Sequence, residues 1–164
     1  MSTPGPAAAQ ARAERGAASQ ALESDRVRAA WDIALTTDVL APLTAGYGVR
    51  VEVAPARWWS LAASPTWLGA ASASGLALVV SVHVWPLAAG LDGPFLGPHL
   101  TGARVEADGA ASVVLGAGGE AGWQLVWGGL AVALSGSVGW AGRVDGGASG
   151  LVFGLRVGLG WAWR

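Results

Sequence analysis

The residues of this chain that could do chemistry are polar and charged side chains set at every second position of otherwise apolar segments. Alternate positions of an extended strand face the same side, so these side chains share one face with small residues such as glycine, alanine and serine. The set consists of Asp32, Asp38, Arg50, Glu52, His83, Glu120, Gln124, Ser135 and Arg156. Buried charges destabilise a fold unless they are paired. The spacing therefore predicts a polar network inside an enclosed space.

Folding the first segments into a hairpin predicts one pair in this network. A hairpin centred on Ala41 places Asp32 opposite Arg50. If the last segment closes onto the first, Arg156 comes within reach of Asp32 or Asp38. These pairs would neutralise both arginines.

Two later hairpins predict a second pair. A turn at Trp127-Gly128 places Glu120 level with Ser135, and a hairpin centred on Asp145 places Ser135 opposite Arg156. Adjacent strands lie about 4.8 Å apart, and the serine side chain is small. We expect Glu120 and Arg156 to meet across Ser135.

The amino-acid composition is unusually apolar and excludes two classes of protein. Of 164 residues, 52% are apolar and the mean hydropathy is +0.45, while 13% are charged, against about 25% in soluble domains. The formal net charge of -1 provides no cationic surface for nucleic acid. No uninterrupted apolar stretch reaches the roughly 20 residues of a transmembrane helix. The apolar residues must therefore belong to another type of secondary structure.

That element is the β-strand. From residue 31 onward, large apolar side chains recur at every second position in eight segments separated by turn residues, which is the strand period. The last segment is the clearest, with Leu151, Phe153, Leu155, Val157, Leu159, Trp161 and Trp163 on one face. No helical pattern separates the segments, so they are joined as hairpins. Residues 31–164 are predicted to form an all-β domain, a closed eight-stranded antiparallel up-and-down barrel.

The first 30 residues differ from the rest. They hold seven charged side chains, many alanines and no aromatic residue. Such a segment has little apolar surface to bury. Residues 1–30 are predicted to be a polar N-terminal tail, flexible or partly helical.

The two faces of the strands indicate where the barrel resides. Glycine, alanine and serine suit the narrow interior of an eight-stranded barrel, which leaves the bulky apolar face outside, against lipid. Strands of about 9 to 12 residues, estimated by dividing residues 31–163 among eight strands, have the length that crosses a bilayer. The sequence therefore predicts a transmembrane barrel. A soluble lipocalin-like ligand-binding barrel is the alternative.

Aromatic residues supply a second indication. If odd strands run one way and even strands the other, most of them fall at one end of the barrel. This predicted interfacial girdle consists of Trp31, Trp58, Trp59, Trp85, Phe95, Trp123, Trp127, Trp161 and Trp163. Indole rings favour the boundary between headgroups and hydrocarbon.

Three stretches punctuated by glycine and aromatic residues carry a resemblance: 43–53 (LTAGYGVRVEV), 93–100 (GPFLGPHL) and 116–124 (GAGGEAGWQ). In these the chain resembles the small bacterial outer-membrane β-barrel proteins of OmpA/OmpX type. The resemblance implies an outer-membrane location, a structural or membrane-integrity role and a lumen filled by side chains, not an open porin-like pore. Implied partners are the lipid bilayer, lipopolysaccharide and the barrel assembly machinery. The N-terminal residues supply no apolar export signal, which this location would require.

Some outer-membrane barrels of this size modify lipid A with serine, histidine and a carboxylate, which makes an enzyme the alternative function. The chain has two histidines, His83 and His99, and neither stands in a recognisable Ser-His-acid spacing. Neither has a second ligand at metal spacing, and the chain has no cysteine. The sequence therefore predicts no enzyme activity, no cofactor and no metal.

Overall fold

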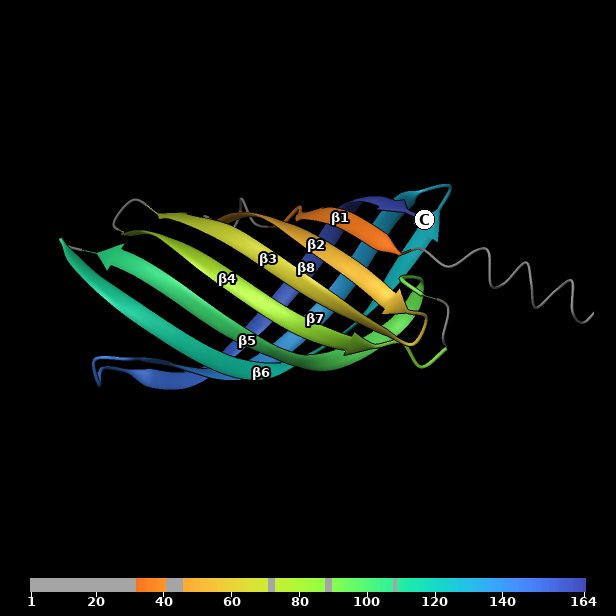
Figure 1. The fold of residues 1–164 in the computed structure, drawn as a ribbon. Coiled ribbons are helices and arrows are strands. Elements are labelled where there is room, and N and C mark those ends of the chain that lie inside the picture. Colours follow the sequence, from red (N-terminus) through yellow and green to blue (C-terminus); the bar gives the residue numbers. More distant parts are fainter. Residues whose placement is uncertain (1–31, 41–45, 71–72, 88–89, 108) are drawn as a thin grey trace, which may run out of the picture. The chain divides into compact units, whose positions relative to one another are not determined.

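A computed structural model describes residues 32–40, 46–70, 73–87, 90–107 and 109–164, which form eight strands and no helix (Figure 1). The strands are β1 (Ile33–Asp38), β2 (Gly46–Ala56), β3 (Trp59–Ala70), β4 (Ala73–Val84), β5 (Gly93–Ala107), β6 (Ala110–Trp127), β7 (Leu130–Arg143) and β8 (Ser149–Trp163). No helix in this part of the chain is long and apolar enough to cross a membrane. Residues 1–30, for which a polar tail is predicted, lie outside the described residues.

The strands close into a barrel in the order of the sequence. Each strand pairs with the next in antiparallel register, and β1 pairs with β8 from Ile33 opposite Trp163 to Asp38 opposite Gly158. This closure leaves no edge strand. The predicted fold, a closed eight-stranded antiparallel up-and-down barrel, is confirmed.

The strands are less uniform than the estimate of 9 to 12 residues. The shortest, β1, has 6 residues, whereas β5 and β8 have 15 each and β6 has 18. The estimate is wrong because it divides the chain evenly, while the β5–β6 ladder continues without interruption to Ala107 opposite Ala110. In Figure 1 this hairpin reaches farthest to the left of all the strands.

The two ends of the barrel have different connections. At the end that holds the C-terminus, here called the C-terminal end, Gly128 and Gly129 join β6 to β7 with φ of 59° and 97°. Positive φ at both central residues is typical of the two-residue turn whose twist matches that of the strands, and glycine adopts it without strain. The opposite end, here called the loop end, carries Gly109 and the 144–148 connection.

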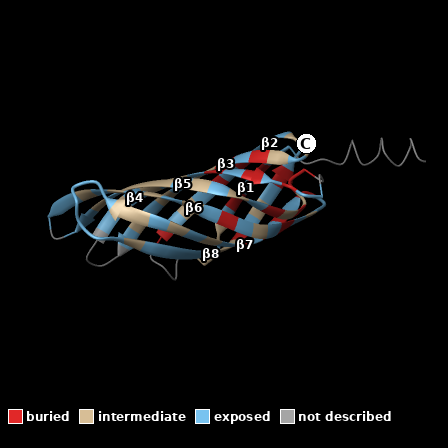
Figure 2. Ribbon diagram, turned by 90° about the horizontal axis from the view of Figure 1, so that it is seen from below, coloured by how far each residue is buried: buried red, intermediate tan, exposed pale blue. Residues whose placement is uncertain are grey.

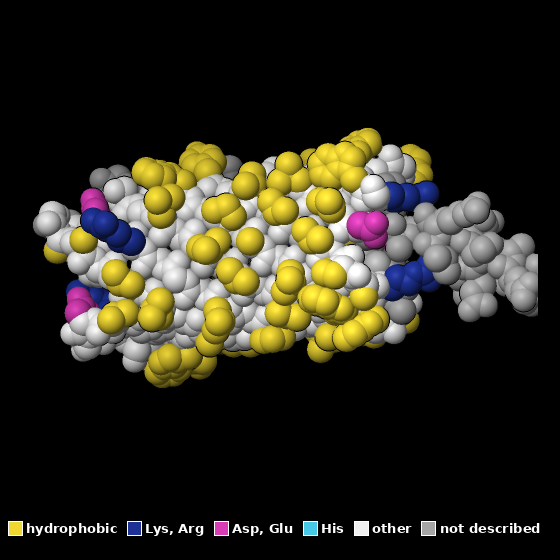
Figure 3. All heavy atoms as spheres, in the orientation of Figure 1, with side chains coloured by type: hydrophobic (Ala, Val, Ile, Leu, Met, Phe, Trp, Pro, Cys, Tyr) yellow, Lys and Arg dark blue, Asp and Glu magenta, His cyan; other side chains and the backbone are white. Residues whose placement is uncertain are grey.

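Side chains alternate between the outside and the lumen along most of each strand, with a shift of register on β2 between Val53 and Ala56. Most outward positions are apolar and exposed, apart from charged residues near the loop end, and most inward positions are small or polar. On β5, the strand with the weakest pattern, Leu96 and Leu100 face out, while His99 and Thr101 line the lumen. In Figure 3 apolar side chains cover the side of the barrel, and charged ones gather toward its two ends.

The half of the lumen nearest the C-terminal end is filled. Trp85, Leu91 and Phe95 are each at most 3% exposed and pack against four alanines, Ala34, Ala54, Ala131 and Ala162. The rings of Trp85 and Phe95 are 5.1 Å apart. Trp85, Leu91 and Phe95 are called the apolar plug below. Figure 2 shows the buried residues concentrated in this half.

The apolar plug corrects part of the predicted girdle. Trp85 and Phe95 point into the lumen and do not face outward. Both follow from strand alternation: Trp85 has the same parity as the inward His83, and Phe95 precedes the outward Leu96. They were predicted to be girdle residues because they lie near the ends of strands. Whether a side chain points outward or into the lumen depends instead on its parity.

Candidate functional site in the barrel lumen

Four ionisable side chains meet in the lumen beside the apolar plug. Arg50 and Glu52 come from β2, His83 from β4 and Glu120 from β6, and none is more than 8% exposed. We call these four residues the charged layer. Alternation directs all four inward, and the small residues around them leave the space that the long side chains occupy.

Arg50 and Glu120 form the central ion pair. Arg50 Nη1 donates to both carboxylate oxygens of Glu120, at 3.0 Å to Oε1 and 3.1 Å to Oε2. Strands β2 and β6 are not neighbours in the sheet, so the pair spans the lumen. Ser135 Oγ donates a further hydrogen bond of 2.7 Å to Glu120 Oε1.

Glu52 ties the charged layer to the apolar plug. Its Oε1 accepts a 2.5 Å hydrogen bond from Ser60 Oγ, and its Oε2 lies 3.5 Å from Arg50 Nε. Ser60 Oγ in turn accepts a 2.9 Å bond from Trp85 Nε1. Sequence reasoning missed Ser60, although its parity on β3 and its register opposite His83 both point to it.

His83 bridges the two carboxylates. Its Nδ1 lies 2.8 Å from Glu52 Oε1 and its Nε2 lies 3.3 Å from Glu120 Oε2. Arg50 Nη2 is also within 3.2 Å of both ring nitrogens. A protonated ring donates to both carboxylates, whereas a neutral ring donates through one nitrogen and accepts from Arg50 through the other. In the protonated state, one guanidinium and one imidazolium balance two carboxylates.

Gln124 contacts the apolar plug and not the charged layer. Its Nε2 donates a 2.8 Å hydrogen bond to the backbone carbonyl of Leu91. The backbone N–H of Val126 donates at 3.1 Å to Asp92 Oδ1 in the same connection. These bonds from β6 hold the β4–β5 connection in the mouth of the barrel.

The predicted meeting of Glu120 and Arg156 is not found. The register pairs Glu120 with Ser137, two residues from the prediction, because the turn is at Gly128–Gly129 and not at Trp127–Gly128. Ser135 does lie opposite Arg156, as predicted. Arg156 donates instead to Thr36 Oγ1, and among the described residues no carboxylate lies within 4.0 Å of its guanidinium.

The two aspartates of the first segment also lie apart from the charged layer. Arg50 is opposite Thr36, not Asp32, because the β1–β2 register centres two residues farther along the chain than assumed. Asp32 is exposed at the C-terminal end. Asp38 is half-buried toward the loop end, and its Oδ1 accepts backbone N–H groups of Leu40 and Val157. The predicted pair of Asp32 with Arg50 is therefore wrong, and Arg156, although it shares a cavity wall with Asp38, forms no ion pair with a described aspartate.

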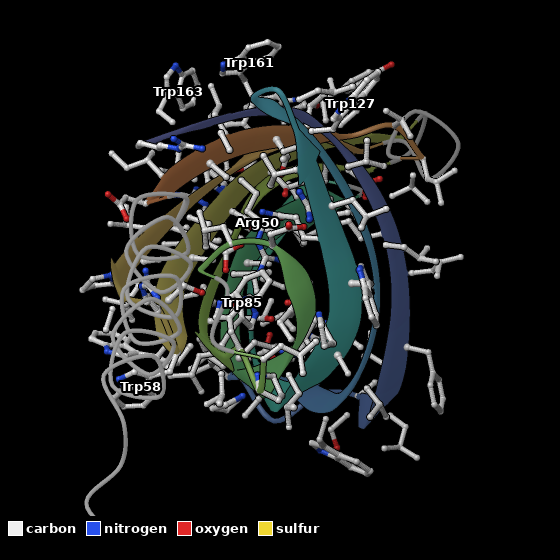
Figure 4. The ribbon with its side chains drawn as sticks, turned by 90° about the vertical axis from the view of Figure 1, so that its right-hand side faces the viewer. Arg50, Trp58, Trp85, Trp127, Trp161 and Trp163 are labelled. Atoms are coloured by element: carbon white, nitrogen blue, oxygen red, sulfur yellow. The ribbon has the colours of Figure 1, made fainter. Side chains whose placement is uncertain are left out.

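The remaining girdle residues differ in exposure. Trp58, Trp123, Trp127, Trp161 and Trp163 are all at least 44% exposed, whereas Trp59 is half-buried. Trp31 lies outside the described residues. In Figure 4 Trp127, Trp161 and Trp163 point away from the strands, while Trp85 lies within the ring that the strands form.

A cavity of about 360 Å³ lies on the other side of the charged layer, toward the loop end. Arg50, Glu120 and Arg156 border it, and Gly46, Gly48, Gly116, Gly139 and Gly154 are among its wall residues. The expectation of a lumen filled by side chains therefore holds in the half near the C-terminal end and fails in the other half. The reason is the small size of the inward residues there.

Nothing in the described part of the chain groups three histidine, cysteine or acidic side chains as a metal site. Comparison of the chain with protein-family models, with curated protein sequences and with solved structures finds no match. The function proposed below is therefore based on the geometry of the barrel.

Proposed function

We propose that this chain is an integral β-barrel protein of a bacterial outer membrane with a structural or membrane-integrity role. The observation that carries the proposal is the inverted distribution of side chains. Apolar side chains, mostly leucine, valine and tryptophan, are exposed on the outside of the strands, while Arg50, Glu52, His83 and Glu120 are buried inside. Lipid is the surrounding that favours such an exterior.

The length of the apolar face supports the proposal. On β4 the outward residues from Leu76 to Val84 are all apolar. Nine strand residues extend about 26 Å, which corresponds to about 20 Å across a membrane at a tilt of about 40°. The apolar face of β8, from Leu151 to Trp163, is longer. At the same tilt the β8 face covers about 30 Å, so the two lengths lie on either side of the apolar band of roughly 25 Å in outer-membrane barrels.

Charged side chains at the loop end suit contact with lipopolysaccharide headgroups. Arg104 pairs with Glu106 at 3.0 Å, and Arg143 pairs with Asp145 at 2.5 Å, all four exposed. Hydrogen bonds from Arg143 lower the pKa of Asp145, which lies in the connection between β7 and β8. Insertion of such a barrel would use the barrel assembly machinery.

A structural role is favoured over catalysis by the arrangement of the lumen. Ser60 Oγ donates to Glu52 and not to His83, and among the described residues no serine or threonine hydroxyl is hydrogen-bonded to His83 or His99. Ser60 and His83 are both fully buried. A lipid A mass-shift assay on membranes that contain the protein tests the enzyme alternative, and no mass change is expected.

The lumen is closed to ions at the plug. The apolar plug and the charged layer fill the C-terminal half, so we expect no steady conductance when the protein is inserted in a planar bilayer. A persistent single-channel current from the wild type would contradict a closed lumen.

A pair of substitutions tests the membrane proposal. Val80 faces outward in the middle of β4, and Val144 is exposed in the β7–β8 connection. In lipid, Val80→Arg should lower the free energy of unfolding by about 2–4 kcal/mol, and Val144→Arg by about 1 kcal/mol or less. Urea titration of protein refolded into vesicles, followed by tryptophan fluorescence, measures both.

The wild type provides the companion observation. Refolding into vesicles should give a trypsin-resistant band whose mobility on an unboiled gel differs from that of the boiled sample. A monomer that is soluble without lipid or detergent, and in which Val80→Arg is as well tolerated as Val144→Arg, would instead favour the lipocalin-like barrel.

A further inference from the structure

A structural role does not explain the volume and the polar lining of the cavity at the loop end. Its volume of about 360 Å³ falls within the range of small-molecule sites, which is about 300–1,000 Å³. Polar side chains of four strands line it: Ser64, Thr66, His99, Thr101, Ser137 and Arg156. A purely structural barrel would gain stability from filling this space with larger side chains.

Arg156 is the distinctive group in this wall. The other lumen arginine, Arg50, is ion-paired with Glu120 and Glu52. Arg156 has one hydrogen bond, to Thr36, and no ion pair with any described carboxylate. A guanidinium has five N–H donors, so most of them are available to a ligand.

Two carboxylates, Glu120 and Asp38, also line the cavity, and both already accept hydrogen bonds from the protein. Glu120 accepts from Arg50 and Ser135, and Asp38 accepts two backbone N–H groups. Ser64 adds an unused polar group to the wall, because its Oγ is buried without a partner in the described structure. The base of the cavity therefore offers donors to an anion.

The wall becomes apolar toward the loop end. Leu68 at the end of β3 and Val152 at the start of β8 line the cavity there, and Val79 on β4, opposite Ser64, adds an apolar side chain nearer the base. Arg156 and Val152 are four residues apart on the same strand and face the same side, a separation of about 13 Å along β8. A ligand with a charged end at Arg156 and an apolar end near Val152 matches this gradient.

We infer that the cavity binds a small amphipathic carboxylate, with its carboxylate on Arg156 and its acyl chain against Leu68, Val79 and Val152. A carboxylate can accept two parallel hydrogen bonds from a guanidinium, which gives this end its orientation. The charged layer closes the cavity on one side, so the ligand enters from the loop end.

Octanoate is the probe for this site, with acetate as the head-only control and octanol as the chain-only control. Each is titrated calorimetrically into the full chain in lipid nanodiscs, with empty nanodiscs as the blank. A protein that stays soluble without lipid is titrated in buffer with the same compounds. Failure of the membrane proposal therefore leaves this test intact.

Three variants complete the experiment. Arg156→Gln removes the charge, Thr101→Phe fills the cavity without touching Arg156, and Arg104→Gln removes an exposed arginine outside the cavity. The first two should weaken octanoate binding at least about tenfold, as expected for loss of a charge-assisted hydrogen bond or of the space. Arg104→Gln should leave it unchanged. An unboiled gel checks that each variant is folded.

The inference is overturned by any of three results in folded protein. The first is the absence of saturable octanoate binding above the empty nanodiscs. The second is equal affinity of the wild type and Arg156→Gln. The third is equal affinity for octanoate and either octanol or acetate, because the site would then not recognise both ends of the ligand.

Discussion

Arg50 Nη1 lies 3.0 Å from Glu120 Oε1 across the lumen, although the two residues stand on strands β2 and β6, which are not paired with each other. The pair links opposite walls of the barrel. Glu52, His83 and Ser135 complete its surroundings. This ion pair therefore connects two strands that share no backbone hydrogen bonds.

Removal of one partner of this pair should be costly. Arg50→Met leaves two buried carboxylates with less compensation, so we expect the free energy of unfolding to fall by about 3–5 kcal/mol. The double variant Arg50→Met, Glu120→Met should lose less than the sum of the single variants. Urea unfolding of the four proteins in vesicles gives the coupling energy.

The exposed pair Arg104–Glu106 provides the control for this cycle. Arg104→Met should change the free energy of unfolding by less than about 1 kcal/mol, because water screens an exposed ion pair. Strictly additive losses at Arg50 and Glu120 would mean that the two side chains do not stabilise the barrel as a pair.

The apolar plug predicts different responses for two tryptophans. Trp85 is 1% exposed and Trp127 is 85% exposed. Trp85→Ala should lower the free energy of unfolding by about 3–5 kcal/mol, since it leaves a cavity and removes the donor to Ser60 Oγ. Trp127→Ala should lower the free energy of unfolding far less when both variants are measured in detergent micelles. Similar losses for both would contradict the inward position of Trp85.

The β6–β7 turn predicts a difference between adjacent glycines. Gly128 has φ of 59°, a conformation that asparagine tolerates. Gly129 has φ of 97°, and a Cβ there would lie 2.6 Å from the ring of Trp161. Gly128→Asn should be nearly neutral, whereas Gly129→Val should lower the free energy of unfolding by about 1–3 kcal/mol. Thermal unfolding on unboiled gels ranks the two variants, and the opposite order would reject this turn geometry.

Asp145 predicts a pH dependence at the loop end. Hydrogen bonds from Arg143 hold its pKa below the ordinary carboxyl value. Because the folded pKa is the lower one, the pair stabilises the loop above the unfolded carboxyl pKa, and this stabilisation is lost as the pH falls through the folded value. A carboxyl ¹³C NMR titration measures the pKa directly.

The matched variant for this titration is Arg143→Gln. It should bring the pKa of Asp145 back toward the value of an isolated aspartate. The control is Arg104→Gln, which removes a different exposed arginine of the loop end and should leave the Asp145 titration unchanged. An unchanged pKa in Arg143→Gln would show that another group holds the carboxylate in its charged form.

Most of the fold was predictable from local pattern. A strand period of two assigns each side chain to a face from its own parity, so the eight strands and the inward direction of Arg50, Glu52, His83 and Glu120 follow from the sequence. Where parity was set aside, as for Trp85 and Phe95, the prediction was wrong. No longer-range information was needed to correct it.

The partners of the inward residues were not predictable in the same way. A register error of two residues keeps every side chain on its face and changes every neighbour, as it did for Asp32 and Arg50 and for Glu120 and Ser135. By itself the sequence determined the strands and their two faces, because alternation is a local property of the chain. Only the tertiary structure decided that Arg50 meets Glu120 and that Arg156 borders a cavity, because contacts across a lumen depend on the register of every strand around the closed barrel.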